Sequence, residues 1–150
     1  MNIPIHNVDS IAGEVEAMQK RIASRAEQLH EDRENGLPLD DWLAAEREII
    51  WRPALDVRQR DGSYVVEAAV AGLEPRQIDV RVAPNDILIA ADVHHQHEHT
   101  ADALLCEFRS GPLFRSYHFD RAIDPERARA DYKNGLLRIT APLRASGGTP

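Results

Sequence analysis

The stretch that decides the fold runs from Ala130 to Ile139 and reads Ala-Asp-Tyr-Lys-Asn-Gly-Leu-Leu-Arg-Ile. Asn134 and Gly135 both tolerate a positive φ, so this pair predicts a two-residue hairpin turn. Apolar side chains recur at every second position on either side of the turn, at Ala128, Ala130, Tyr132, Leu137, Ile139 and Ala141. The stretch is therefore predicted to be an antiparallel β-hairpin with one buried face.

The same alternation continues outward from this hairpin toward the N-terminus. Its apolar positions are Tyr64, Val66, Ala68 and Val70, then Ile78, Val80 and Val82, then Ile87, Ile89, Ala91 and Val93, and finally Tyr117 and Phe119. Short strands at even spacing, with no long helix between them, indicate an antiparallel β-sandwich. We expect this mainly β domain to span residues 53–143, followed by a short disordered tail over residues 144–150.

The first third of the chain has a helical period instead. Asp9 or Ser10 can cap a first helix, and Asn35-Gly36 supplies a stop. Asp40 can then cap a second, shorter helix. The apolar stripe of the first helix comprises Ile11, Val15, Met18, Ile22, Ala26 and Leu29. We therefore predict that residues 1–52 form an N-terminal extension that contains a helical hairpin.

Charge and composition exclude several classes of protein. The chain of 150 residues has a formal net charge of −7, which argues against a general nucleic-acid binder. Residues 1–53 carry 11 acidic and 6 basic side chains, and residues 54–150 carry 14 and 12, so the excess lies mainly in the helical part. Neither a signal peptide nor a membrane-spanning run is visible, and a single cysteine makes no internal disulfide. We expect a cytoplasmic protein that binds neither nucleic acid nor membrane.

The motifs of common enzyme classes are missing from the sequence. It contains no Walker loop, no Gly-x-Gly-x-x-Gly and no Gly-x-Ser-x-Gly, and its acidic residues form no spaced pair on one predicted face. We therefore expect no enzymatic activity, no catalytic residues and no cofactor.

A histidine-rich tract interrupts the strands, and metal binding by this tract is the most specific alternative function. His94, His95, His97 and His99 could ligate a transition metal, with Glu98 or Cys106 completing the site. The spacing matches no defined metal site, and such tracts are usually solvated, so we predict no metal site. A metal-responsive protein and a pH-sensing loop remain alternatives.

Several motifs resemble the small heat-shock protein family, whose core is the α-crystallin domain. Its arginine strand is matched by Gly111, Leu113, Arg115, Tyr117 and Phe119. Its Ala-x-x-x-Asn-Gly signature is matched by Ala130 and by Asn134 to Ile139, and Ala69 to Leu73 resembles its turn, with Ala71 where proline is usual. The resemblance covers residues 53–143 and implies an immunoglobulin-like β-sandwich of the α-crystallin type.

A second resemblance lies upstream. Residues 25–48 are similar to a short bacterial helical module of unknown function that sometimes precedes this domain. This resemblance places a second module directly before the domain and indicates a bacterial protein, but it implies no activity.

The family resemblance implies an ATP-independent holdase chaperone. Such a protein binds partly unfolded clients under stress and prevents their aggregation, and it associates with itself as a homodimer or a larger oligomer. The expected partners are therefore non-native proteins and further copies of this chain. The alternative from another class is an adaptor or co-chaperone module that binds one folded partner.

The resemblance also implies two elements of the dimer interface. One is a strand that is exchanged between subunits, matched here by Leu104, Leu105, Cys106, Glu107 and Phe108. The other is Arg115, which matches an arginine that makes polar contacts near the interface. An ordinary loop and a solvent-facing arginine are the alternatives.

One departure from the family concerns its C-terminal Ile-x-Ile motif, which docks in a groove at a neighbour's sheet edge. No such motif follows Leu143, but Ile3-Pro4-Ile5 has the required shape. A frayed terminus is the alternative. The groove strands would present Ile78, Val80, Val82, Ala128, Ala130 and Tyr132. The candidate client-binding residues are Ile11, Val15, Met18, Ile22 and Leu29, which could equally pack against the protein itself.

Overall fold

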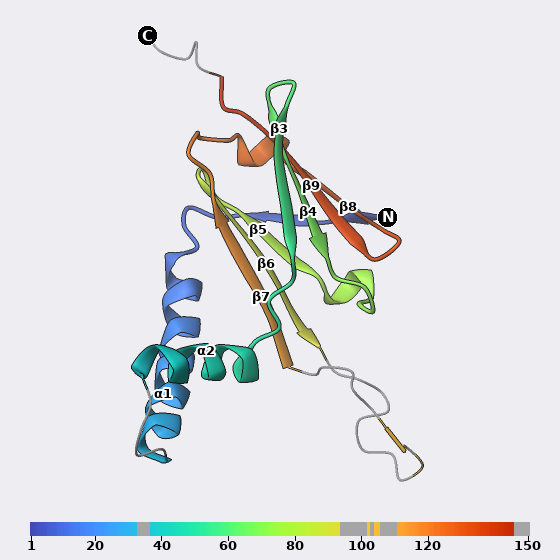
Figure 1. Cartoon of the computed structure of the whole chain (residues 1–150). Coiled ribbons are helices and arrows are strands. Elements are labelled where there is room, and N and C mark those ends of the chain that lie inside the picture. Colours follow the sequence, from blue (N-terminus) through green and yellow to red (C-terminus); the bar gives the residue numbers. More distant parts are fainter. Residues whose placement is uncertain (33–36, 94–101, 103, 106–110, 146–150) are drawn as a thin grey trace. The chain divides into compact units, whose positions relative to one another are not determined.

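A computed structural model describes residues 1–32, 37–93, 102, 104–105 and 111–145 (Figure 1). The chain divides into two compact units. One unit comprises residues 1–11, 53–91 and 114–150, and the other comprises residues 12–52 and 92–113.

The first unit contains a five-stranded sheet in the order β1-β8-β9-β4-β3 (Figure 1). All of its neighbouring strands are antiparallel. Its strands in chain order are β1 (Asn2–Ile3), β3 (Leu55–Arg60), β4 (Ser63–Ala69), β8 (Arg129–Lys133) and β9 (Leu136–Pro142). The hairpin predicted around Asn134-Gly135 is β8–β9.

The second sheet has the strand order β2-β5-β6-β7. Its strands are β2 (Ile5–Asn7), β5 (Asp79–Val82), β6 (Asp86–Val93) and β7 (Gly111–His118), and two short 3₁₀ helices lie at Pro75–Gln77 and Pro125–Arg127. The expectation of purely antiparallel sheets is wrong at one pair, because β2 is parallel to β5. The chain continues from β1 beside β8 to β2 beside β5 without reversing its direction. It is therefore antiparallel to β8 and parallel to β5.

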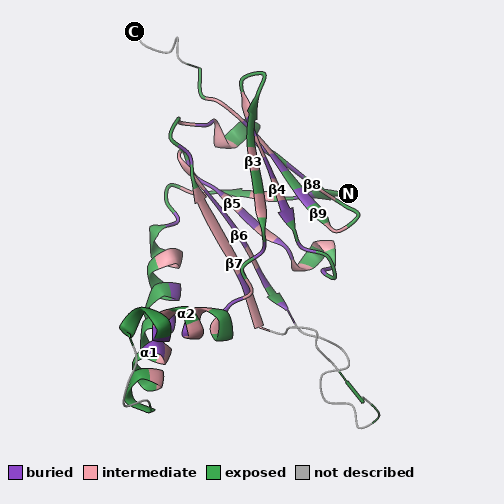
Figure 2. Ribbon diagram, viewed as in Figure 1, coloured by how far each residue is buried: buried purple, intermediate pink, exposed green. Residues whose placement is uncertain are grey.

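Buried positions, purple in Figure 2, follow the strands of both sheets. Their side chains form the core and are mostly branched aliphatic. Fully buried members include Val66, Val80, Val82, Ile87, Ile89, Leu137 and Ile139. Two buried aromatic rings also belong to the core: Tyr64 stacks on Phe119, with ring centroids 4.4 Å apart. Burial of the predicted alternating positions confirms the mainly β sandwich.

Two hairpin turns have positive φ angles at both of their central residues. Asn134 and Gly135 have φ values of 55° and 79°, as the Asn-Gly signal predicts. Asp61 and Gly62 form the same arrangement between β3 and β4, with φ values of 49° and 79°. The Asp-Gly pair is an equally good hairpin signal, although this turn was not predicted.

The second unit contains the predicted helical hairpin, α1 (Ala12–Asp32) and α2 (Pro38–Ile49). Met18, Ile22 and Ala26 of α1 and Ala45 of α2 are buried. The expectation that Asp40 caps the second helix is wrong, because the helix begins at Pro38 and Asp40 lies in its first turn. Proline suits a first-turn position, since its fixed φ is helical and the missing N–H has no intrahelical partner there.

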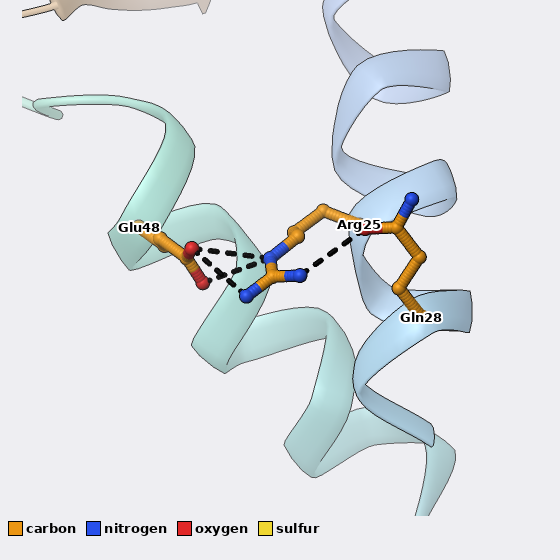
Figure 3. A network of polar contacts seen from close by, with 3 residues as sticks. All are labelled: Arg25, Gln28 and Glu48. Atoms are coloured by element: carbon orange, nitrogen blue, oxygen red, sulfur yellow. Dashed lines mark hydrogen bonds and ion pairs between the residues drawn. The ribbon is translucent and has the colours of Figure 1, made fainter. Parts of the chain in front are cut away.

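Polar contacts also join the two helices. The Arg25 guanidinium donates to both carboxylate oxygens of Glu48 at 3.1 Å and to Gln28 at 3.1 Å (Figure 3). The Asp41 carboxylate is 2% exposed and lies 2.7 Å from His30 Nδ1. A buried carboxylate is costly without polar partners, so the His30 contact helps to fix the register of the hairpin.

The helical extension was expected to include everything before residue 53. Residues 1–11 instead group with the sandwich, because Asn2–Ile3 and Ile5–Asn7 are strands of its two sheets. The remainder of the extension, residues 12–52, groups with residues 92–113. Residues 146–150 of the expected tail lie outside the described residues.

Candidate strand-docking site at the sandwich edges

Two strands at the edges of the sandwich are paired with the N-terminal segment, residues 1–8. In the first sheet, Ile3 lies opposite Ala130 of β8. In the second sheet, Ile5 lies opposite Val80 of β5. Pro4 lies between the two pairings and has no N–H, so the chain loses no ladder hydrogen bond where it crosses from one sheet to the other.

Main-chain hydrogen bonds hold this segment at both of its ends. The Tyr132 N–H donates to the Met1 carbonyl oxygen at 2.8 Å, and the Val8 N–H donates to the Val82 carbonyl oxygen at 3.0 Å. Backbone pairing of this kind depends little on side-chain identity. The edges of β8 and β5 therefore form a site for an extended apolar segment.

The two isoleucines of the segment are not equivalent. Ile3 is 4% exposed, whereas Ile5 is half-buried. The strands beneath them carry the expected residues, of which Ile78, Val80, Val82, Ala128 and Ala130 are buried and Tyr132 is half-buried. The structure thus brings Ile3-Pro4-Ile5 and both groove strands together within one chain.

A groove of about 250 Å³ runs along the segment on the side of β8. It is lined by Asn2, Ile3, Pro4, Ile5, Asn7, Pro125, Glu126, Ala128, Arg129 and Ala130. The lining is formed by the segment together with the 3₁₀ turn and the strand beside it, and it contains no paired acid and base of a catalytic kind.

Tyr132 connects this site to a turn on the opposite side of the strand. Its hydroxyl lies 3.2 Å from the Val70 carbonyl oxygen and 2.9 Å from the Leu73 carbonyl oxygen. Its N–H meanwhile holds Met1. Tyr132 was predicted only as an apolar groove residue, because no pattern in the sequence reveals where a hydroxyl on a strand will reach.

The predicted exchange strand is only partly described. Leu104 and Leu105 lie outside helices and strands and are 103% and 77% exposed. Cys106, Glu107 and Phe108, like the histidine tract at 94–99, lie outside the described residues. Arg115 is half-buried in β7, and its Nε atom is buried.

The candidate client-binding stripe is largely covered in this structure. Ile11, Met18 and Ile22 are buried, and Val15 and Leu29 are half-buried. These side chains are packed within this chain, and their part in client binding stays a prediction. Among the described residues of the helical part, the exposed large apolar side chains are instead Leu37, Leu39 and Leu43.

Among the described residues, no group of three or more His, Cys, Asp or Glu side chains could hold a metal ion. No described helix is both long enough and apolar enough to cross a membrane.

Comparison with known proteins identifies the sandwich. Residues 56–148 match the model of the Hsp20/alpha crystallin family. This chain belongs to the Hsp20/alpha crystallin family. The match covers more than half of the chain and nearly the whole predicted sandwich, so the family resemblance drawn from the sequence is confirmed.

Curated relatives of this Hsp20 family chain include proteins from several bacteria. Spore protein SP21 of Stigmatella aurantiaca is 26% identical over 61% of this chain and 55% of its own length. A probable 15 kDa heat shock protein of Leptospira interrogans is 25% identical over 66% of this chain and 75% of its own. An 18 kDa heat shock protein of Clostridium acetobutylicum is 28% identical over 62% and 63%. The chain thus spans only about half to three quarters of these relatives.

Solved structures of small heat-shock proteins share the fold. HspA of Xanthomonas axonopodis superposes with a TM-score of 0.55 at 25% identity, covering 63% of this chain and 95% of that one. A small heat-shock protein of Xylella fastidiosa, described as having a distinct high order structure, has a TM-score of 0.58 at 25% identity and covers 67% and 92%. The α-crystallin type of the sandwich is therefore established.

Proposed function

We propose that this Hsp20 family protein is an ATP-independent holdase that binds partly unfolded proteins and prevents their aggregation. The observation that carries the proposal is the pairing of an extended apolar segment with the edges of β8 and β5 through main-chain hydrogen bonds. A site of this kind accepts extended chains of varied sequence, which is what a binder of non-native proteins needs. Relatives named as heat shock proteins support the same role.

The test is suppression of aggregation without nucleotide. Several unrelated proteins are heated with the purified chain, and light scattering is followed at near-stoichiometric ratios. A holdase suppresses scattering of all of them. Capture of a single folded partner without suppression would favour the adaptor alternative, and suppression only after metal is added would favour the metal-responsive one.

The second part of the proposal concerns self-association through the N-terminal segment. The bonds from Tyr132 and to Val82 join main-chain atoms, so an identical segment of a second copy can form them equally well. We propose that Ile3-Pro4-Ile5 exchanges between its own and a neighbour's edges, as the family's Ile-x-Ile motif docks at a neighbour's sheet edge.

Solution mass tests this exchange. The full chain is compared with a chain lacking residues 1–9 and with the Ile3→Ser/Ile5→Ser double variant. We expect both to form smaller assemblies than the full chain. A Leu136→Ser variant is the matched control, because Leu136 is a 44% exposed side chain on β9, which β8 separates from β1. Unaltered mass in both N-terminal variants would refute the exchange.

The third part of the proposal is a strand-exchanged homodimer. Leu104 and Leu105 are more exposed than large apolar side chains usually remain, which favours a second protein surface that covers them. The outer edge of β3 ends the first sheet, so its backbone can accept another strand. We propose that Leu104 to Phe108 pair with β3 of a partner and that Arg115 makes polar contacts near that interface.

Substitution of the two leucines tests the dimer. Leu104→Ser/Leu105→Ser is expected to raise the monomer fraction at micromolar concentration in sedimentation experiments, and Leu136→Ser again serves as control. Arg115→Ala should weaken the dimer to a smaller extent. A double variant that dimerises like the parent would exclude this strand from the interface.

A further inference from the structure

A short segment after α2 is tied to the first residues of β7. Ile50 closes the helix by donating its N–H to the Glu46 carbonyl oxygen at 3.0 Å and then adopts an extended backbone, with φ −125° and ψ 149°. The next N–H, that of Trp51, donates to the Pro112 carbonyl oxygen at 2.8 Å. Trp51 forms a parallel bridge with Leu113. The helical hairpin thus ends on the strand that follows the predicted exchange segment.

Side chains on both sides of this bond are buried. Ile50 is 5% exposed and Leu113 is 1% exposed, while Trp51 itself is half-buried. Shielding from water strengthens a hydrogen bond and raises the cost of losing it, because the freed carbonyl has less access to solvent. Loss of the hydrogen bond between Trp51 and Pro112 is therefore expected to be costly.

The backbone on the β7 side of the contact is unusual at two successive residues. Gly111 has a φ of +116°, a region that residues with a β-carbon rarely adopt. Pro112 follows, with a φ fixed by its ring and no N–H to donate. The Pro112 carbonyl is consequently the one main-chain hydrogen-bonding group of that residue, and it is the group that Trp51 binds.

We infer that Trp51 is a positioning residue for self-association: its backbone N–H fixes Gly111–Leu113, through which the segment carrying Leu104 and Leu105 joins β7. This inference rests on the strand-exchanged dimer proposed above. Because Gly111 is conformationally permissive, loss of the bond lets the chain leave β7 in more directions. Leu104 and Leu105 then adopt less often the orientation that β3 of a partner accepts, so the dimer weakens.

Two substitutions at residue 51 separate the N–H from the indole. Trp51→Pro removes both, and Trp51→Ala removes the indole alone. Ile50 already has the extended backbone that a following proline favours, so the proline variant requires no change in the preceding residue. Arg52→Ala is the neighbouring control, since it breaks an exposed ion pair with Glu46 at 3.3 Å and leaves the Trp51 N–H in place.

The readout is the dimer dissociation constant from sedimentation, with thermal unfolding recorded in parallel. We expect Trp51→Pro to dissociate several times more readily than Trp51→Ala. About tenfold, the factor that corresponds to one hydrogen bond, is the upper limit, because the bond lies within one chain and affects the dimer only through the order it imposes on the exchange segment. Arg52→Ala should match the parent. Equal dissociation constants for the proline and alanine variants would overturn the inference while leaving the dimer intact.

Amide hydrogen exchange in the unmodified protein supplies a measurement that does not depend on the folding of a variant. The Trp51 amide is expected to exchange at least tenfold more slowly than an unstructured amide, because it is bonded to Pro112. Exchange at the unstructured rate would overturn the inference. A parent chain that stays monomeric at all concentrations would overturn the proposed dimer, and this inference with it.

Discussion

Gly135 lies so close to Ala71 that a β-carbon on residue 135 would be 2.9 Å from the Ala71 β-carbon. The two residues belong to different turns, the β8–β9 hairpin and the turn that follows β4, and the Val70 N–H donates to the Gly135 carbonyl oxygen at 2.9 Å. Glycine is therefore required here twice, by its φ of +79° and by the lack of space.

Gly135→Ala should consequently destabilise the sandwich by about 2–4 kcal/mol, from the sum of left-handed strain and steric overlap. Gly62→Ala is the matched control, because Gly62 has the same φ of +79° but no atom within 4 Å of the added carbon. It should cost only about 1–2 kcal/mol, the strain alone. Urea unfolding of both variants measures the difference, and equal losses would show that the close approach has no energetic effect.

The Tyr132 hydroxyl holds the turn after β4 through the carbonyls of Val70 and Leu73. Tyr132→Phe removes this hydroxyl and keeps the ring, so we expect a loss of about 1–2 kcal/mol from a half-buried site. The comparison is Tyr64→Phe, whose hydroxyl accepts one longer bond of 3.3 Å from the Arg121 N–H. Denaturant titration should rank Tyr132→Phe as the more damaging change, and the reverse order would contradict this assignment.

Loss of the His30 imidazole should destabilise the helical hairpin. His30→Leu deprives the buried Asp41 carboxylate of a partner at 2.7 Å. His30 is itself 53% exposed, so solvent compensates in part and we expect a loss of about 1 kcal/mol.

Arg25→Ala serves as the comparison for His30→Leu, because the Arg25–Glu48 pair joins the same helices but its carboxylate is 51% exposed. It should cost less, about 0.5 kcal/mol. Thermal melts followed by far-ultraviolet circular dichroism compare the two variants. A larger effect of Arg25→Ala would show that burial of Asp41 does not govern this interface.

The two isoleucines of the N-terminal segment should respond differently to substitution. Ile3→Ser affects a side chain that is 4% exposed and should weaken docking by about 2–3 kcal/mol. Ile5→Ser affects a half-buried side chain and should cost about half as much.

Hydrogen exchange at the Tyr132 amide reports this docking directly, because that N–H is bonded to the Met1 carbonyl oxygen. We expect faster exchange in Ile3→Ser than in Ile5→Ser. The same exchange rate in both variants and in the parent would indicate that neither isoleucine holds the segment on β8.

Much of the sandwich is predictable from the sequence because its signals are local. The alternation at Ile78, Val80 and Val82 specifies which face of a strand is buried, and Asn134-Gly135 specifies a turn. The helical stripe at Met18 and Ile22 specifies a packed face in the same way. Such signals depend on the period of the side chains along the chain and need no knowledge of distant residues.

The sequence by itself determined most strands of the sandwich, the helical hairpin, the family and the shape of the Ile3-Pro4-Ile5 motif, but not the strands β1 and β2 that this motif forms. Only the tertiary structure decided that this motif joins both sheets of its own chain, parallel to β5, that the Tyr132 hydroxyl reaches the turn after β4, and that the Trp51 N–H meets Pro112. These contacts join residues between about 60 and 130 positions apart. Backbone hydrogen bonds carry no sequence pattern, so their partners become known only when the edges of the folded sheets are placed in space.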